Sequence, residues 1–107
     1  MRKNERLYRH VVLFKFKPET GAETLGDIEA AFAALAAKLP FIVDFEWGRN
    51  SSPENLDRGY THCFIVSFQD AAGRDLYLPH PAHLAFCREY LDPNLDEVCV
   101  VDFKPER

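Results

Sequence analysis

The stretch RHVVLFKFK at residues 9–17 decides the fold of this chain. It is rich in β-branched and aromatic residues, which is typical of a strand, and Pro18 ends it. Both faces of such a strand are apolar, so we expect both to be covered. Alternation gives the members of the two faces: His10, Val12, Phe14 and Phe16 on one, Val11 and Leu13 on the other.

A second stretch, YTHCFIVSFQ at residues 60–69, has the same two-sided character and predicts another central strand. Residues 41–48 (FIVDFEWG) alternate between apolar and polar side chains, which predicts a strand with one wet face. Residues 97–103 (EVCVVDF) predict the last strand. In residues 60–69, alternation places His62, Phe64, Val66 and Phe68 on one face and Cys63 and Ile65 on the other.

Helices are predicted between these strands. Residues 22–39 carry apolar side chains at spacings of three and four, which form one stripe along a helix. Asp70 can cap a short helix that runs to about Leu78. A further helix over about 81–91 begins at Pro81, because proline lacks the N–H that has no partner at the first helical position.

The element order is therefore strand, helix, strand, strand, helix pair, strand. The chain of 107 residues has room for one domain, with its core at about residues 9–104. This order predicts the α+β class: a ferredoxin-like β-α-β-β-α-β fold with a four-stranded antiparallel sheet. Right-handed crossovers put the first and third strands side by side in the middle, with both helices on one face.

The face without helices has to be covered by something else. It carries Val11, Leu13, Cys63 and Ile65, and the same face of a second copy is the simplest cover. We therefore expect a homodimer.

Composition excludes several classes of function. The formal net charge is −4, and no run of Lys or Arg is long enough to follow a phosphate backbone, so we expect no nucleic-acid partner. The apolar run 11–14 stops at Lys15, which is too short for a signal peptide or a membrane span, so we expect a soluble, cytoplasmic protein. The three cysteines lack a C-x-x-C spacing, and their odd number argues against a disulfide framework.

The segment YLPHPAH, from Tyr77 to His83, carries the candidate catalytic pair. If Pro81 is the first helical residue, His83 is the third, and the helix dipole there disfavours imidazolium. A general base requires a neutral imidazole. The proline-flanked corner can fold the Tyr77 phenol back toward His83, where it can hold the tautomer of the ring or donate to an oxyanion. His80, at the corner itself, is more often a helix cap or a surface residue than a functional residue.

His10 and His62 open the two central strands on the same face. If these strands are parallel neighbours, the two imidazoles lie close together on that face. The alternative is that both are hydrogen-bonded histidines at strand ends, and spacing alone favours this structural interpretation over a functional one. Phe32, Phe64 and Phe86 stand at spacings found more often in a core than in a pocket lining.

No metal or cofactor is expected. His80 and His83 have the i, i+3 spacing of a ligand pair. Zinc usually takes three or four ligands, and no third ligand stands at a diagnostic spacing.

Four motifs together resemble those of the stress-responsive α/β-barrel (Dabb) family: HVVLFKFK at residues 10–17, the pair Trp47-Gly48, GYTH at residues 59–62 and YLPHPAH at residues 77–83. The resemblance covers about residues 9–104 and implies a dimeric α/β barrel. One plant member of the family is a cyclase that closes a linear polyketide thioester by an intramolecular aldol condensation, without a cofactor.

The resemblance also implies roles for individual residues. His83 would be the base at a carbon next to a carbonyl, and Tyr77 would orient it and stabilise an enolate-like oxygen. The segment Leu91–Leu95 departs from the cyclase, because it has no bulky aromatic residue. The implied substrate-binding residues are His10, His62, Phe32 and Phe86, and we expect Phe64 beside them.

Three functions stay open at this point. The first is a cofactor-free cyclase-like or lyase-like enzyme for a small hydrophobic carbonyl compound. The second is a non-catalytic stress-response or ligand-binding dimer, which is favoured if Phe32, Phe64 and Phe86 fill the cleft. The third is a monooxygenase, with haem or without a cofactor.

Overall fold

The computed structural model describes residues 6–106; residues 1–5, at the charged N-terminal end, and Arg107 lie outside the described part. Within it, the elements are β1 (Tyr8–Phe16), α1 (Ala22–Lys38), β2 (Asp44–Arg49), β3 (His62–Phe68), α2 (Ala71–Tyr77), α3 (Pro81–Phe86), the π-helix η1 (Cys87–Leu91) and β4 (Leu95–Phe103). This order confirms the expected ferredoxin-like arrangement.

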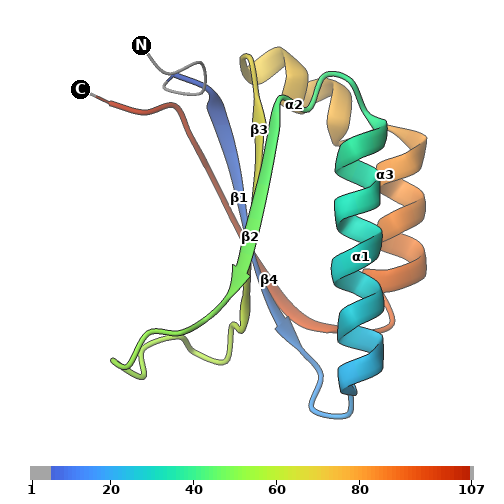
Figure 1. Cartoon of the computed structure of the whole chain (residues 1–107), viewed down its shortest axis with the longest axis vertical. Helices are drawn as coiled ribbons and strands as arrows, with labels where there is room; N and C mark the ends of the chain where they lie inside the picture. The colour runs from blue at the N-terminus through green and yellow to red at the C-terminus, as the bar shows by residue number, and fades with distance from the viewer. Residues whose placement is uncertain (1–5, 107) are drawn as a thin grey trace.

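The four strands form one antiparallel sheet in the order β2-β3-β1-β4. The two strands that are apolar on both faces, β1 and β3, are therefore the central pair, as predicted. Figure 1 shows α1 and α3 standing side by side over one face of the sheet, with α2 crossing near one end. Within residues 6–106, the other face carries no helix.

The pairing of β1 with β3 corrects one expectation. These strands are antiparallel, so His10 lies opposite Val66, whereas His62 lies opposite Phe14. Both histidines are buried on the helix-facing side, but at opposite ends of the strand pair. They are not neighbours.

The core lies between the sheet and α1. The stripe on α1 buries Ile28, Phe32 and Leu35 against β1 and β3. The ring of Phe32 lies 4.6 Å from that of Phe64 on the sheet and 4.8 Å from that of Phe86 on α3. Burying a side chain of this size contributes about 1.5–3 kcal/mol, so this cluster fixes both helices on the sheet.

The helix predicted over 81–91 has two parts. Pro81 occupies the start of α3, and His80 caps it by accepting the N–H of Ala82 at Nδ1 (3.0 Å), which confirms the expected cap. After Phe86 the chain widens into the π-helix η1, where the N–H of Asp92 donates to the carbonyl of Cys87. Such turns are often found at functional sites.

The helix-free face keeps its apolar character. Val11, Leu13, Cys63 and Ile65 are half-buried, although no element of the described chain packs over them. Val101 on β4 is 57% exposed. We call this the open face.

Candidate active site

A cavity of about 440 Å³ lies between the helix-facing side of β1 and β4 and the segment from α2 to η1. We call it the inner cavity. Its volume falls within the range of small-molecule pockets, about 300–1,000 Å³. Most of its wall is aliphatic or aromatic, and the titratable side chains on it are His10, Tyr77, His83, Cys87, Asp92 and Asp102.

The corner between α2 and α3 brings Tyr77 and His83 together. Their ring centroids are 4.2 Å apart, with 39° between the ring planes. Nδ1 of His83 lies 2.9 Å from the carbonyl oxygen of Leu78, and because a carbonyl only accepts, Nδ1 carries the proton. The tautomer is thus set by the Leu78 backbone rather than by the Tyr77 phenol, and Nε2 keeps its lone pair.

Burial favours the neutral form of both groups. It lowers the pKa of His83, and the hydrogen bond to Leu78 offsets this only in part. We expected that direction from the helix dipole, but desolvation is the main cause. Burial also raises the pKa of Tyr77, so its hydroxyl stays protonated and can donate. That hydroxyl has no hydrogen-bond partner among residues 6–106.

His10 stands on the same wall, held by a chain of polar contacts. Its Nδ1 lies 2.7 Å from Oδ1 of Asp102 on β4, and Nη1 of Arg74 on α2 lies 3.2 Å from Oδ2 of the same carboxylate. Arg74 also donates to the hydroxyl of Tyr8 at 2.7 Å. The ring of His10 lies 5.8 Å from that of Tyr77.

Sequence reasoning missed Asp102 and Arg74. A signal existed for Asp102: it is a charged residue in an apolar strand, and the pairing of β1 with β4 puts it opposite His10. No feature of the sequence near Arg74 predicts its contact with Asp102, which lies 28 residues later in the chain.

Cys87, the first residue of η1, contacts His83. Its Sγ lies 3.4 Å from Nε2 of His83, within reach of an S–H hydrogen bond. Burial raises the pKa of the Cys87 thiol, so it is protonated near neutral pH and can act as this donor.

Of the expected substrate-binding residues, His10, Phe32 and Phe86 line the inner cavity, whereas His62 and Phe64 do not. Phe64 is fully buried beneath Phe32. The cavity therefore remains open, with Phe32 and Phe86 forming its wall rather than filling it.

His62 is held at the other end of the sheet. Its Nε2 lies 2.7 Å from Oε2 of Glu29 on α1, and the same carboxylate oxygen pairs with Arg49 at 2.6 Å. Burial would raise the pKa of Glu29, but the hydrogen bonds from His62 and Arg49 outweigh it and lower the pKa below its usual value. Trp47 stacks on the other side of the imidazole, with 5° between the planes. This arrangement ties α1 to β2 and β3.

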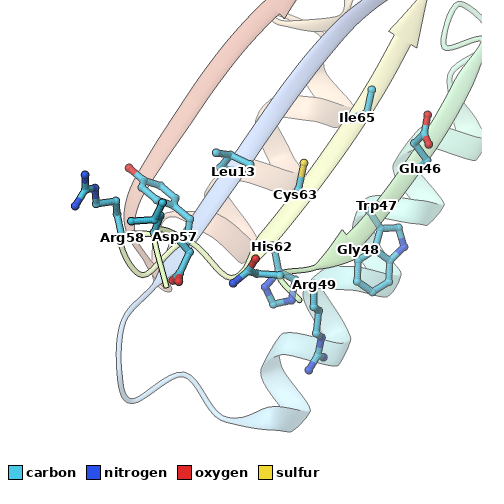
Figure 2. Close-up of a pocket in the computed structure, with 13 residues that line it drawn as sticks. Leu13, Glu46, Trp47, Gly48, Arg49, Asp57, Arg58, His62, Cys63 and Ile65 are labelled. Atoms are coloured by element: carbon cyan, nitrogen blue, oxygen red, sulfur yellow. The ribbon is translucent and has the colours of Figure 1, made fainter. Parts of the chain in front are cut away.

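A second pocket, of about 570 Å³, lies where the loop after β2 folds past the end of the open face, and His62 is one of its lining residues. In Figure 2, Cys63 and Ile65 lie along β3 and Leu13 lies on the neighbouring strand β1, and His62 and Arg49 lie together near the end of the sheet. This outer pocket is thus continuous with the open face. It shares none of its lining residues with the inner cavity.

In the described part of the chain, no three His, Cys, Asp or Glu side chains come together as a metal site. Nor does any helix within residues 6–106 have the length and apolar character needed to cross a bilayer.

The fold and the inner cavity can be compared with known proteins. The family model described as Stress responsive A/B Barrel Domain matches residues 8–105. The chain belongs to the Dabb family. Within this family, it is 36% identical over 97 residues to the stress-response A/B barrel domain-containing protein HS1 of Arabidopsis thaliana, a match that covers 91% of this chain and 88% of the relative.

An enzyme is among the similar proteins. Olivetolic acid cyclase of Cannabis sativa is 26% identical, over 92% of this chain and 97% of its own. A crystal structure of an Arabidopsis thaliana protein superimposes with a TM-score of 0.87 at 35% identity, covering 94% of this chain and 96% of the other. The Dabb fold is thus shared along nearly the full length of these proteins.

Proposed function

We propose that this Dabb protein is a small cofactor-free enzyme of the cyclase or lyase type, which removes a proton from a carbon next to a carbonyl group. His83 is the base, and Tyr77 donates to the oxygen that becomes enolate-like. One observation carries the proposal: the rings of Tyr77 and His83 meet at 4.2 Å on the wall of a cavity, with Nδ1 of His83 held by a backbone carbonyl.

The protonation states support these roles. A base must be neutral, and burial keeps His83 so by lowering its pKa. An oxyanion donor must keep its proton, and burial of Tyr77 raises its pKa. The free hydroxyl of Tyr77 is available to a substrate oxygen.

The wall of the cavity supports a neutral, largely apolar substrate. Lysine and arginine are absent from the residues that line it in the described chain. A carboxylate or phosphate group would find no lysine or arginine there, whereas Phe32, Phe86 and Leu95 can pack against a hydrophobic carbonyl compound. The similarity to olivetolic acid cyclase supports the reaction class.

A ligand-binding protein without turnover is the second candidate, and Cys87 favours it. Its thiol lies 3.4 Å from Nε2 of His83, the nitrogen that the base would use. If the thiol keeps that hydrogen bond when a ligand is bound, the cavity holds the ligand without taking its proton.

Turnover of β-keto thioesters by the purified protein separates the two candidates. We expect His83→Asn to reduce kcat by about 10²–10⁴-fold, because asparagine can still donate to the Leu78 carbonyl but supplies no basic nitrogen. His80→Asn is the matched control: it changes a nearby histidine outside the cavity and keeps a helix cap. Equal rates for both variants rule out His83 as the base, and binding without turnover by the wild type selects the second candidate.

We also propose that the protein acts as a homodimer through the open face. The half-buried row of Val11, Leu13, Cys63 and Ile65 supports this, because a single small chain rarely leaves such a face to water. A dimeric ferredoxin-like protein from Thermobifida fusca has the same fold, with a TM-score of 0.78 at 19% identity over 98% of this chain and 96% of its own.

Sedimentation at micromolar concentration tests the dimer. We expect twice the chain mass of 12.3 kDa for the wild type, and a monomer or an aggregate for Leu13→Glu. Leu84→Glu, at a site on α3 that is 47% exposed and away from the open face, should remain dimeric. A wild type that sediments as a single chain contradicts the proposal.

A further inference from the structure

We propose that His10 is a second proton-carrying residue of the inner cavity, and that Arg74 is the positioning residue that holds it in its working orientation through Asp102. This inference rests on the proposed function for its chemistry. Its structural part, the state of the His10 ring, can be tested without any substrate.

The contacts define which nitrogen of His10 faces which partner. Nδ1 lies 2.7 Å from Oδ1 of Asp102, and a carboxylate accepts, so Nδ1–H is the donor. Nε2 then remains for the cavity, since His10 lines the cavity and no residue within 6–106 is hydrogen-bonded to Nε2. The imidazole is 5% exposed, so the carboxylate and the packed Tyr77 ring limit its movement.

Arg74 completes this arrangement from α2. One nitrogen, Nη1, contacts both the Tyr8 hydroxyl at 2.7 Å and Oδ2 of Asp102 at 3.2 Å, and the other end of the guanidinium is held by Asp75 at 2.9 Å. The carboxylate is thereby held from both sides: Oδ2 by the arginine and Oδ1 by the histidine. A carboxylate placed in this way fixes the tautomer of a histidine and stabilises the imidazolium that forms during a reaction.

Two histidines lie beside Tyr77: the centroid of its ring is 4.2 Å from that of His83 and 5.8 Å from that of His10. An aldol reaction has two proton transfers, one from carbon and one to the new alkoxide, and the two histidines can divide them. Nε2 of His83 takes the proton of the carbon, and the electron pair of that C–H bond moves into the enolate, whose oxygen accepts from Tyr77. The enolate carbon forms the new C–C bond, and the proton on Nε2 of the His10 imidazolium passes to the resulting alkoxide. Solvent then carries the proton from Nε2 of His83 to Nε2 of His10, which restores both residues.

The lyase direction is the reverse of these steps. His10 takes the hydroxyl proton, the C–C bond breaks, and the His83 imidazolium returns a proton to carbon. Burial is the main cause that lowers the pKa of His83, and the hydrogen bond to Leu78 acts in the opposite direction. A positive charge on His10 would lower this pKa further. A proton on His10 therefore favours the neutral, basic form of His83, as this proton flow requires.

The test is the NMR spectrum of ¹⁵N-labelled histidine in the wild type, Arg74→Met and Arg88→Met. We expect the neutral His10 ring of the wild type to be the Nδ1–H tautomer. In Arg74→Met we expect a mixture of the two neutral tautomers, because Asp102 loses the contact that holds its carboxylate in place. Arg88→Met, at an exposed arginine on η1, should match the wild type. An Nε2–H tautomer in the wild type, or an unchanged His10 signal in Arg74→Met, overturns the inference.

Kinetics separate this inference from the proposed function. If the wild type turns over, we expect Arg74→Met to lose about 10–100-fold in kcat with little change in KM, as residues that orient a reactive group do. Asp102→Asn should lose more, because it disturbs the tautomer directly. No turnover by a wild type that has the expected tautomer leaves the Arg74–Asp102–His10 arrangement standing and refutes only the chemistry; full activity of a folded Arg74→Met refutes the positioning role.

Discussion

The substitution Tyr77→Phe removes one oxygen atom from the inner cavity and leaves the rest of its wall in place. Tyr77 is 1% exposed, and its ring packs against His83 at 4.2 Å, Phe68 at 5.5 Å and His10 at 5.8 Å. All of these ring contacts remain with phenylalanine. The lost hydroxyl has no hydrogen-bond partner among residues 6–106, so its removal leaves no donor or acceptor unpaired.

Stability and activity should therefore respond very differently to this change. We expect the free energy of unfolding to change by less than about 0.5 kcal/mol, because no buried partner is left unsatisfied. If the hydroxyl donates to the enolate oxygen, its loss should lower kcat by about 10²–10³-fold, or about 2.7–4 kcal/mol of transition-state stabilisation. Tyr77→Ala, which also removes the ring, should cost about 3–5 kcal/mol of stability.

The assay combines urea denaturation with initial rates on a β-keto thioester. Tyr60→Phe is the control, because that hydroxyl contacts Glu97 at 3.3 Å and lies outside the inner cavity; it should leave kcat unchanged. Wild-type rates in Tyr77→Phe would refute the oxyanion role. A loss of stability greater than about 1 kcal/mol would show instead that the hydroxyl has a structural partner.

Three further predictions concern His83, Glu29 and Cys87. Burial lowers the pKa of His83 in the folded protein below its ordinary value of 6.5, so neutral His83 contributes to stability above pH 6.5. This contribution is lost as the pH falls through the folded pKa. Between pH 7 and 5, Tm should therefore drop more in the wild type than in His83→Asn. Glu29→Gln should cost about 1.5–3 kcal/mol in urea denaturation at pH 7, because it weakens charge-assisted bonds to His62 and Arg49, and since the pKa of Glu29 is lowered the difference should vanish below its folded pKa. Cys87→Ala should raise kcat, or leave it unchanged, by freeing Nε2 of His83, and a clear decrease in kcat would assign the thiol a catalytic role instead.

The sequence determined the order of the elements and the face of the sheet on which each strand side chain lies. The element order and right-handed crossovers identified β1 and β3 as the central strands. The alternation in residues 9–17 and 60–69 then showed that both strands have two apolar faces. The stripe on α1 identified the helix face that meets the sheet, including Phe32. Local chemistry also identified His80 as a cap, because a cap bonds to a backbone group two residues away.

Contacts within the 77–83 corner could likewise be anticipated. Tyr77 and His83 are six residues apart, and the prolines between them leave the chain few ways to turn. The sequence suggested that the Tyr77 phenol holds the tautomer of His83, but the Leu78 carbonyl holds it instead.

Only the tertiary structure decided which distant side chains meet. The antiparallel register separates His62 from His10 and places Asp102 opposite His10, and α2 then brings Arg74 onto the same carboxylate. Alternation assigns a side chain to a face but carries no information on where along that face its cross-strand neighbour stands. That position is set by packing across the whole sheet, which is why one end of the sheet became a structural ion pair and the other a candidate active site.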